Sequence, residues 1–285
     1  MKLITKLITF LVYGNVCISL CAIACLQTNL LLLDKKVDFF IYCIVFFGTF
    51  CAYQISFLGL KKATSSKFQI SALRFKIFKA SFWISLFILS LFCIIYLSIY
   101  QLCFLLHLSL IAIIYTLGVP NLSKKNKHKL FIIKPLRLFL FQKTFWVAYV
   151  WASLTLFFPF CETLDKINYQ LFLFFIARFL MMWCLTLPFD IRDAITDKEA
   201  SLQTIYLRLG HKKYVILIAI ILFISFLLHS YLFPQYYISF FVIHLVIFLL
   251  NLFAKPQNHE LYFTGFIDGT LIMEFLVLIS QKYLV

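Results

Sequence analysis

The sequence predicts an all-α membrane protein that crosses the bilayer with nine helices. Hydrophobic residues make up 64% of its 285 residues, and the mean hydropathy is +0.99. Soluble domains contain only roughly 45–50% apolar residues. A water-soluble fold could not bury this much apolar surface, so lipid must surround most of the chain.

Nine apolar runs justify the predicted helices. A span needs about 20 apolar residues, and polar breaks leave runs of about that length at 7–33, 38–60, 80–99, 101–119, 144–160, 168–188, 214–233, 236–254 and 262–281. The first run exceeds the roughly 7–15 residues of a secretory signal core, so we expect it to be retained. Tyr100–Gln101 and Pro234–Gln235 each divide two runs, which predicts two tight hairpins. The runs predict one transmembrane domain over residues 1–285.

The basic residues predict the orientation. Lys and Arg favour the cytoplasmic side of a membrane. With the N-terminus inside and the C-terminus outside, the cytoplasmic segments hold 21 of the 26 basic residues, mainly in loops at about 61–79, 120–143 and 189–213. We expect this orientation in a bacterial cytoplasmic membrane. The net charge of +15 is spread over loops, which argues against nucleic acid and favours anionic lipids or an anionic substrate as partners.

The segment 187–210, LPFDIRDAITDKEASLQTIYLRLG, gathers acids in one predicted cytoplasmic loop. A helix beginning after Pro188 would place Asp190, Asp193 and Asp197 within about 60° of one another. Like charges on one face repel, and a divalent cation would remove that repulsion. Carboxylate oxygens suit Mg²⁺. The alternative is a solvated loop in which the acids pair with Arg192, Lys198 and Arg208.

These residues resemble the second aspartate motif of the UbiA superfamily of intramembrane prenyltransferases. The family commonly reads Asp/Asn-x-Arg-Asp-x-x-x-Asp, then a small residue, a Thr-Leu-Pro-like turn and Leu-Gly. The matching residues here are Asp190, Arg192, Asp193, Asp197, Thr204, Leu209 and Gly210, while Ser201 stands where Gly is usual and Ile205-Tyr206 replaces Leu-Pro. The resemblance implies a nine-helix UbiA-type bundle that holds a prenyl diphosphate through Mg²⁺. The prenyl group would then pass to a lipophilic acceptor, such as an aromatic compound, in a water-free chamber.

The family's first aspartate motif is missing. Its place at the end of the second span reads CAYQISFLGLKK, residues 51–62, where Gln54 is the one relic of the usual Asn. If the chain is an enzyme, cations must contact the diphosphate directly. The candidates at the cytoplasmic helix ends are Lys61, Lys62, Arg137 and Lys143, with Lys143 first because it begins the fifth span.

The resemblance therefore implies a set of roles. Asp190, Asp193 and Asp197 would bind the metal, and Asp193, Asp197 and Lys143 would be catalytic. Cofactor binding would fall to Lys61, Lys62, Arg137 and Arg192, and also to Asp268, which is expected to line the same cavity as the aspartate loop.

Other assignments remain open. Arg178 is expected to form a buried pair with Glu274 or Asp268, because charge is costly within a membrane. A non-catalytic relative that binds an isoprenoid or lipid is the main alternative to an enzyme. A secondary transporter that uses Asp268 and Glu274 is a third possibility, although the sequence shows no inverted repeat.

Overall fold

The computed structural model describes residues 15–60, 72–117, 119–120, 131–133, 142–161, 169–199 and 203–284. Its α-helices are α2 (Val16–Leu32), α3 (Phe39–Leu60), α4 (Ala72–Tyr96), α5 (Ile99–Leu117), α6 (Gln142–Ala152), α7 (Tyr169–Thr186), α8 (Pro188–Arg192), α9 (Ala194–Glu199), α10 (Ile205–Leu232), α11 (Tyr237–Leu252) and α12 (Asp268–Leu284). Shorter helical turns include η2 (Ser153–Phe157), η4 (Pro234–Tyr236) and η5 (Tyr262–Ile267). Two short strands, β1 (Val119–Pro120) and β2 (Phe131–Ile133), form an antiparallel pair.

The helices have the length and composition of an integral membrane protein, as predicted. Five helical segments among the described residues could cross a membrane: Lys143–Cys161, Tyr169–Arg192, Ile205–Leu232, Pro234–Leu252 and Tyr262–Tyr283. Four further apolar helices are shorter: Val16–Leu32, Phe39–Ile55, Ala80–Tyr96 and Ile99–Tyr115. The all-α membrane fold is confirmed, while nine crossings stay a prediction.

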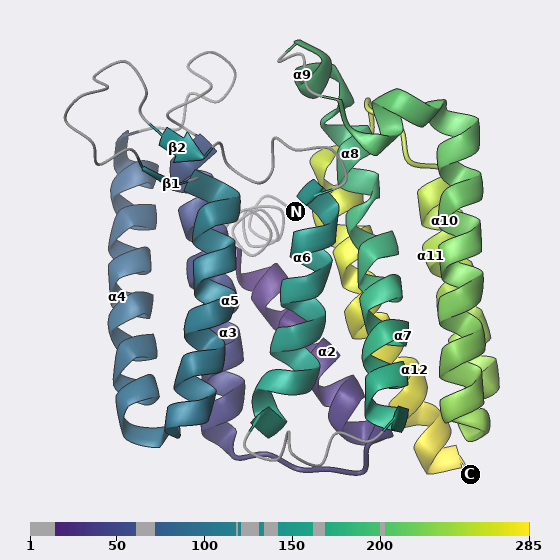
Figure 1. Ribbon diagram of the computed structural model, residues 1–285, viewed down its shortest axis with the longest axis horizontal. Helices are drawn as coiled ribbons and strands as arrows, with labels where there is room; N and C mark the ends of the chain where they lie inside the picture. Colours follow the sequence, from purple (N-terminus) through teal and green to yellow (C-terminus); the bar gives the residue numbers. More distant parts are fainter. Residues whose placement is uncertain are drawn as a thin grey trace, which may run out of the picture.

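The helices pack side by side into a bundle that closes on itself (Figure 1). Neighbours contact one another in the order α2, α3, α5, α6, α7, α10, α11, α12 and back to α2, with α4 covering α3 from outside. Large apolar side chains on α4 and α10, such as Phe87 and Phe223, are exposed, as expected for surfaces that face lipid. The short helices α8 and α9 lie at one end of the bundle, together with the β1–β2 pair.

The break between α4 and α5 lies earlier than the sequence suggested. The structure places it at Leu97–Ser98 instead of Tyr100–Gln101. The Gln101 N–H donates to the Ser98 hydroxyl at 3.3 Å, and the Ser98 N–H donates to the Gln101 side chain at 3.2 Å. This is a capping box, in which both residues satisfy N–H groups at the start of α5. Gln101 therefore belongs to the helix and does not interrupt it.

Two π-helical turns adjoin the bundle helices. η2 directly follows α6, and η5 directly precedes α12. A π turn displaces carbonyl groups from the regular helical hydrogen bonds. In η2, the Asn29 amide of α2 donates to the Thr155 carbonyl at 3.0 Å and to the Thr155 hydroxyl at 3.2 Å. Asn29 is fully buried, so this contact ties α2 to the irregular turn inside the core.

A buried ion pair lies next to this turn. Arg178 on α7 donates to the Glu274 carboxylate on α12 at 2.5 Å, and both side chains are 0% exposed. Arg178 also contacts the Cys25 sulfur on α2 at 3.2 Å. Of the two partners expected for Arg178, the structure selects Glu274 and leaves Asp268 to line a cavity.

Candidate functional site

Asp190 and Asp197 lie on two short helices, with Asp193 between them, instead of on the single helix that the sequence suggested. Pro188 occupies the first turn of α8, where its missing N–H costs nothing. The helix ends at Arg192, and Asp193 stands at the junction with φ −84° and ψ −1° before α9 begins. The Tyr214 hydroxyl of α10 donates to the Leu187 carbonyl at 2.8 Å and fixes the start of α8 against the bundle.

Lys143 binds all three aspartates. Its ammonium nitrogen lies 2.8 Å from Asp193 Oδ2, 3.2 Å from Asp197 Oδ2 and 3.6 Å from Asp190 Oδ1. Asp190 and Asp197 are only 2% and 8% exposed. The solvated-loop alternative is therefore wrong for these two acids, because they are buried around a lysine.

Two hydrogen bonds position Lys143 next to the aspartates. The Trp183 indole N–H of α7 donates to the Thr144 hydroxyl at 3.1 Å, and the Thr186 hydroxyl donates to the Thr144 carbonyl at 3.2 Å. The start of α6 is thereby attached to the end of α7, which leads directly into α8. We call Lys143, Asp190, Asp193 and Asp197 the lysine–aspartate cluster.

Arg192 extends this cluster toward the last helix. Its guanidinium contacts Asp193 Oδ1 at 2.8 Å and Glu260 Oε1 at 2.9 Å. It also lies over the Phe189 ring, 4.8 Å from the ring centre, in the geometry of a cation–π contact. Arg192 thus bridges two acids that are far apart in the sequence.

Asp193 and Asp197 differ in their surroundings. Burial opposes ionisation of Asp193, but Arg192 and Lys143 together outweigh it and lower the pKa of this carboxyl. For Asp197, burial is the larger influence, and its pKa is raised in spite of the attraction of Lys143. Both shifts follow from the opposing effects of desolvation and nearby charge. Asp193 is therefore the more firmly ionised of the two.

The cluster has the donor chemistry of a divalent-cation site, with a lysine at its centre. Among the described residues, no three His, Cys, Asp or Glu side chains converge closely enough to hold a metal ion as they stand. The ammonium of Lys143 lies between the carboxylates and acts as a stand-in cation. Mg²⁺ is usually bound by one or two carboxylates together with substrate phosphates, so the residues fit this metal once the ammonium has moved aside.

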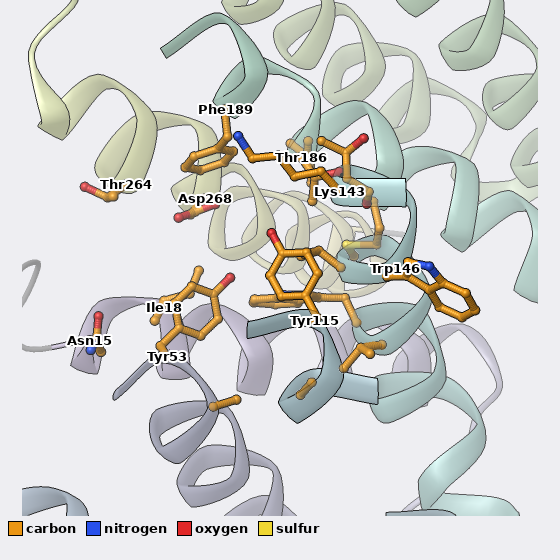
Figure 2. A pocket seen from close by; sticks show the side chains of 18 of the residues that line it. Asn15, Ile18, Tyr53, Tyr115, Lys143, Trp146, Thr186, Phe189, Thr264 and Asp268 are labelled. Carbon is orange, nitrogen blue, oxygen red and sulfur yellow. Dashed lines mark hydrogen bonds between the residues drawn. The ribbon is translucent and has the colours of Figure 1, made fainter. Parts of the chain in front are cut away.

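A cavity of about 350 Å³ opens beside the cluster, within the size range of small-molecule sites. Its lining comes from α2, α3, α5, α6, α7, α8 and α12. Lys143, Arg192 and Asp193, which are in contact with one another, form a polar part of this lining, and Figure 2 shows Lys143 there next to Thr186. Its walls are rich in aromatic side chains, namely Tyr53, Tyr115, Trp146, Trp151 and Phe189.

Some of the predicted site residues are among the described residues, and others lie outside them. Asp268 lines the same cavity as Lys143 and Arg192, as expected. Lys61, Lys62 and Arg137 lie outside the described residues. Gln54, at the place of the missing first motif, is 1% exposed and its amide has no hydrogen-bond partner among the described residues.

Several site residues were not identified from the sequence. Glu260, which lies 68 positions from its partner Arg192, was not among the predicted site residues. The aromatic lining could not be told from lipid-facing residues, because aromatics make up 19% of the chain. The position of Glu260 just before the last span was the one available signal.

Solved structures share this fold over nearly the whole chain. A structure of digeranylgeranylglyceryl phosphate synthase matches with a TM-score of 0.57 and 16% identity, covering 99% of this chain and 100% of that one. A UbiA homologue from Aeropyrum pernix K1 matches with a TM-score of 0.62 and 14% identity, covering 93% and 97%. A UbiA homologue from Archaeoglobus fulgidus bound to GPP and Mg²⁺ matches with a TM-score of 0.55 and 12% identity, covering 92% and 96%. No family model and no curated protein matches the sequence. The chain therefore has the UbiA-type fold.

Proposed function

We propose that this UbiA-type bundle is an integral-membrane prenyltransferase, which moves an isoprenyl group from a prenyl diphosphate to a lipophilic acceptor. The observation that carries the proposal is the lysine–aspartate cluster, which forms a polar part of the lining of an aromatic cavity. Cations and carboxylates in that part suit a metal–diphosphate, and the apolar walls suit an isoprenyl chain. The Archaeoglobus homologue of the same fold binds GPP and Mg²⁺.

Each group of the site has a part in the proposed reaction. Lys143 exchanges its carboxylate contacts for a phosphate oxygen, and Arg192 adds positive charge nearby. Asp190, Asp193 and Asp197 would hold Mg²⁺, which neutralises the charge that develops on the departing diphosphate. The bond from the allylic carbon to the diphosphate breaks, and its electron pair stays with the diphosphate. Aromatic faces such as that of Trp151 stabilise the allylic carbocation that remains and exclude water from it.

The proposed orientation places this site at the cytoplasmic face of the membrane. The cluster lies at the bundle end that carries α8, α9 and the β1–β2 pair, and in the proposed orientation the basic segments at about 61–79, 120–143 and 189–213 are the cytoplasmic loops. Anionic lipid headgroups would contact these loops. A bacterial cytoplasmic membrane is the proposed location.

A binding and turnover experiment tests the proposal. The purified protein, reconstituted in lipid nanodiscs, is mixed with geranyl diphosphate with and without Mg²⁺, and bound donor and released diphosphate are measured. We expect Mg²⁺-dependent binding that the double variant Asp193→Asn/Asp197→Asn loses. The matched control is Asp34→Asn/Asp38→Asn, which removes the same charge from exposed positions between α2 and α3, distant from the cluster. Equal binding by both double variants would refute the assignment.

A second candidate is a non-catalytic relative that binds an isoprenoid or lipid. The observation that favours it is the absence of acids in the α3 sequence, residues 39–60, where Gln54 takes the place of the first motif. The same experiment separates the two functions. Mg²⁺-dependent binding of geranyl diphosphate without diphosphate release, in the presence of any acceptor, would favour the non-catalytic relative.

A further inference from the structure

The cavity ends at a defined depth on four of the helices that surround it. Among the described residues, the lining residues farthest from the lysine–aspartate cluster on these helices are Ile18 of α2, Trp151 of α6, Met182 of α7 and Leu271 of α12. One or two helical turns beyond them, in the same direction, lie four buried residues, Cys25, Thr155, Arg178 and Glu274. The cavity therefore stops where these four residues begin.

These four residues and Asn29 form one connected network, which we call the polar floor. Arg178 contacts both the Glu274 carboxylate and the Cys25 sulfur. The Cys25 thiol donates to the Thr155 hydroxyl at 3.3 Å, and the Asn29 amide donates to the same hydroxyl at 3.2 Å. All five residues are buried. An apolar chain that reached this level would separate the polar groups without replacing their hydrogen bonds, which is costly.

Trp151 lies between the cavity and the polar floor. Its backbone carbonyl accepts a hydrogen bond from the Thr155 hydroxyl at 2.8 Å, which attaches it to the network one turn further on. Its indole N–H donates a hydrogen bond to the Tyr53 hydroxyl of α3, and both side chains line the cavity. The bulky indole is therefore held in one orientation, immediately before the level at which polar groups fill the bundle.

The distance from the cluster to Trp151 sets the length available to an isoprenyl chain. Lys143 and Trp151 lie on the same regular helix, α6, and their separation along it is about 12 Å at 1.5 Å per residue. An extended chain advances roughly 1.2 Å per bond, as an extended polypeptide does, so each isoprene unit spans about 5 Å. Two units reach about 10 Å and three reach about 15 Å. A ten-carbon chain therefore ends before Trp151, and a fifteen-carbon chain would have to displace the indole.

We propose that Trp151, backed by the polar floor, limits the donor to a ten-carbon prenyl diphosphate. Geranyl diphosphate fits between the cluster and the indole, and donors of fifteen or more carbons do not. As an account of the donor's chain length, this inference rests on the proposed function. The cavity volume of about 350 Å³ agrees with a short chain, because it lies near the lower end of the roughly 300–1,000 Å³ of ligand sites.

The test measures binding instead of turnover, because Trp151 also faces the proposed carbocation. The protein in lipid nanodiscs with Mg²⁺ is loaded with radiolabelled geranyl diphosphate, and unlabelled geranyl, farnesyl and geranylgeranyl diphosphates compete with it. Empty nanodiscs give the free concentration of each donor and so correct for partition into lipid. A single surplus methylene can cost roughly tenfold or more in a closed pocket. We therefore expect the wild type to bind geranyl diphosphate at least about tenfold more tightly than farnesyl diphosphate.

Variants of Trp151 should lengthen the accepted chain by one unit only. Trp151→Ala should bind farnesyl diphosphate about as tightly as geranyl diphosphate and still exclude geranylgeranyl diphosphate, because the polar floor remains. Trp151→Leu, which keeps a smaller apolar side chain, should give an intermediate ratio of the two affinities and replaces the Ala variant if that variant does not fold. The matched control is Trp146→Ala, the same substitution on the same helix nearer to Lys143 (Figure 2). It should keep the wild-type ratio of farnesyl to geranyl affinity.

The outcomes separate this inference from the proposed function. If the wild type binds all three donors equally, or if the Trp151 variants keep the wild-type ratio, the inference is wrong, even where geranyl diphosphate binds in Mg²⁺. If Trp151→Ala admits geranylgeranyl diphosphate as readily as farnesyl diphosphate, the polar floor does not limit the chain and that part of the inference is overturned. If the wild type binds none of the three donors, the proposed function itself fails, and the inference fails with it.

Discussion

Replacing Lys143 with Met should make the aspartates bind a divalent cation in the absence of diphosphate. Met keeps the length and bulk of the side chain but removes the ammonium that lies 2.8 Å, 3.2 Å and 3.6 Å from the three carboxylates. In the wild type, an entering metal ion must first displace that ammonium. In the variant, no ammonium lies between the three carboxylates, and among them only Asp193 keeps a cationic partner, Arg192.

The size of the effect follows from the bonds that the metal must break. Lys143 makes two charge-assisted hydrogen bonds, to Asp193 and Asp197, each worth about 1.5–3 kcal/mol. Neighbouring bonds are not additive, and Lys143 is 17% exposed, so we take about 3 kcal/mol for both together. At 1.4 kcal/mol per factor of ten, metal affinity should rise about 100-fold.

The assay uses Mn²⁺ in place of Mg²⁺, because the free ion can be counted by electron paramagnetic resonance. Lys198→Met is the matched control, since Lys198 is exposed on α9 and its loss changes the charge of the same segment by the same amount. Only Lys143→Met should gain affinity, and metal should raise its melting temperature more than that of the wild type. Equal Mn²⁺ affinity in the two variants would refute the idea that the ammonium occupies a cation position.

Three further predictions concern the scaffold and its orientation. Arg178→Met should lower the free energy of unfolding, measured by chemical denaturation, by about 3–5 kcal/mol, because it leaves Glu274 buried and unpaired. The double variant Arg178→Met/Glu274→Leu should recover most of that stability. Gly210→Ala should cost about 1–3 kcal/mol in the same measurement, since Gly210 has φ 73° and ψ 162°, a conformation that is essentially restricted to Gly. Reporter fusions should place position 200 in the cytoplasm and position 164 outside; the reverse result would contradict the proposed location of the site.

The sequence predicted the features that depend on local pattern. Apolar runs mark the bundle helices because each must face lipid over its length. The spacing of Asp190, Asp193 and Asp197 predicted that the three side chains lie close together. Even so, the helix break at Asp193 was missed, since a two-helix arrangement and a single helix both place the three acids close together. The start of α5 was misplaced for a different reason, because Gln101 was interpreted as a polar break instead of half of a capping box.

Contacts between distant residues could not be predicted in the same way. Lys143 was favoured among four cations, but its contact with all three aspartates depends on how α6 packs against α7. The pairing of Arg178 with Glu274, 96 positions apart, depends on which faces of α7 and α12 meet. A single sequence does not specify those faces when apolar residues surround each helix.

The π turn at Ser153–Phe157 affects how the chain tolerates changes in length. A π turn holds one residue more than a regular helical turn, so the loss of one residue there would convert it to ordinary helix and leave both flanking segments facing as before. The same loss between Lys143 and Trp151 would rotate Lys143 by about 100° relative to the rest of the helix and away from the aspartates. Single-residue deletions in this helix should therefore be tolerated at the π turn, where they sacrifice the contacts of Asn29 and Cys25 with Thr155. Between Lys143 and Trp151 they should abolish function.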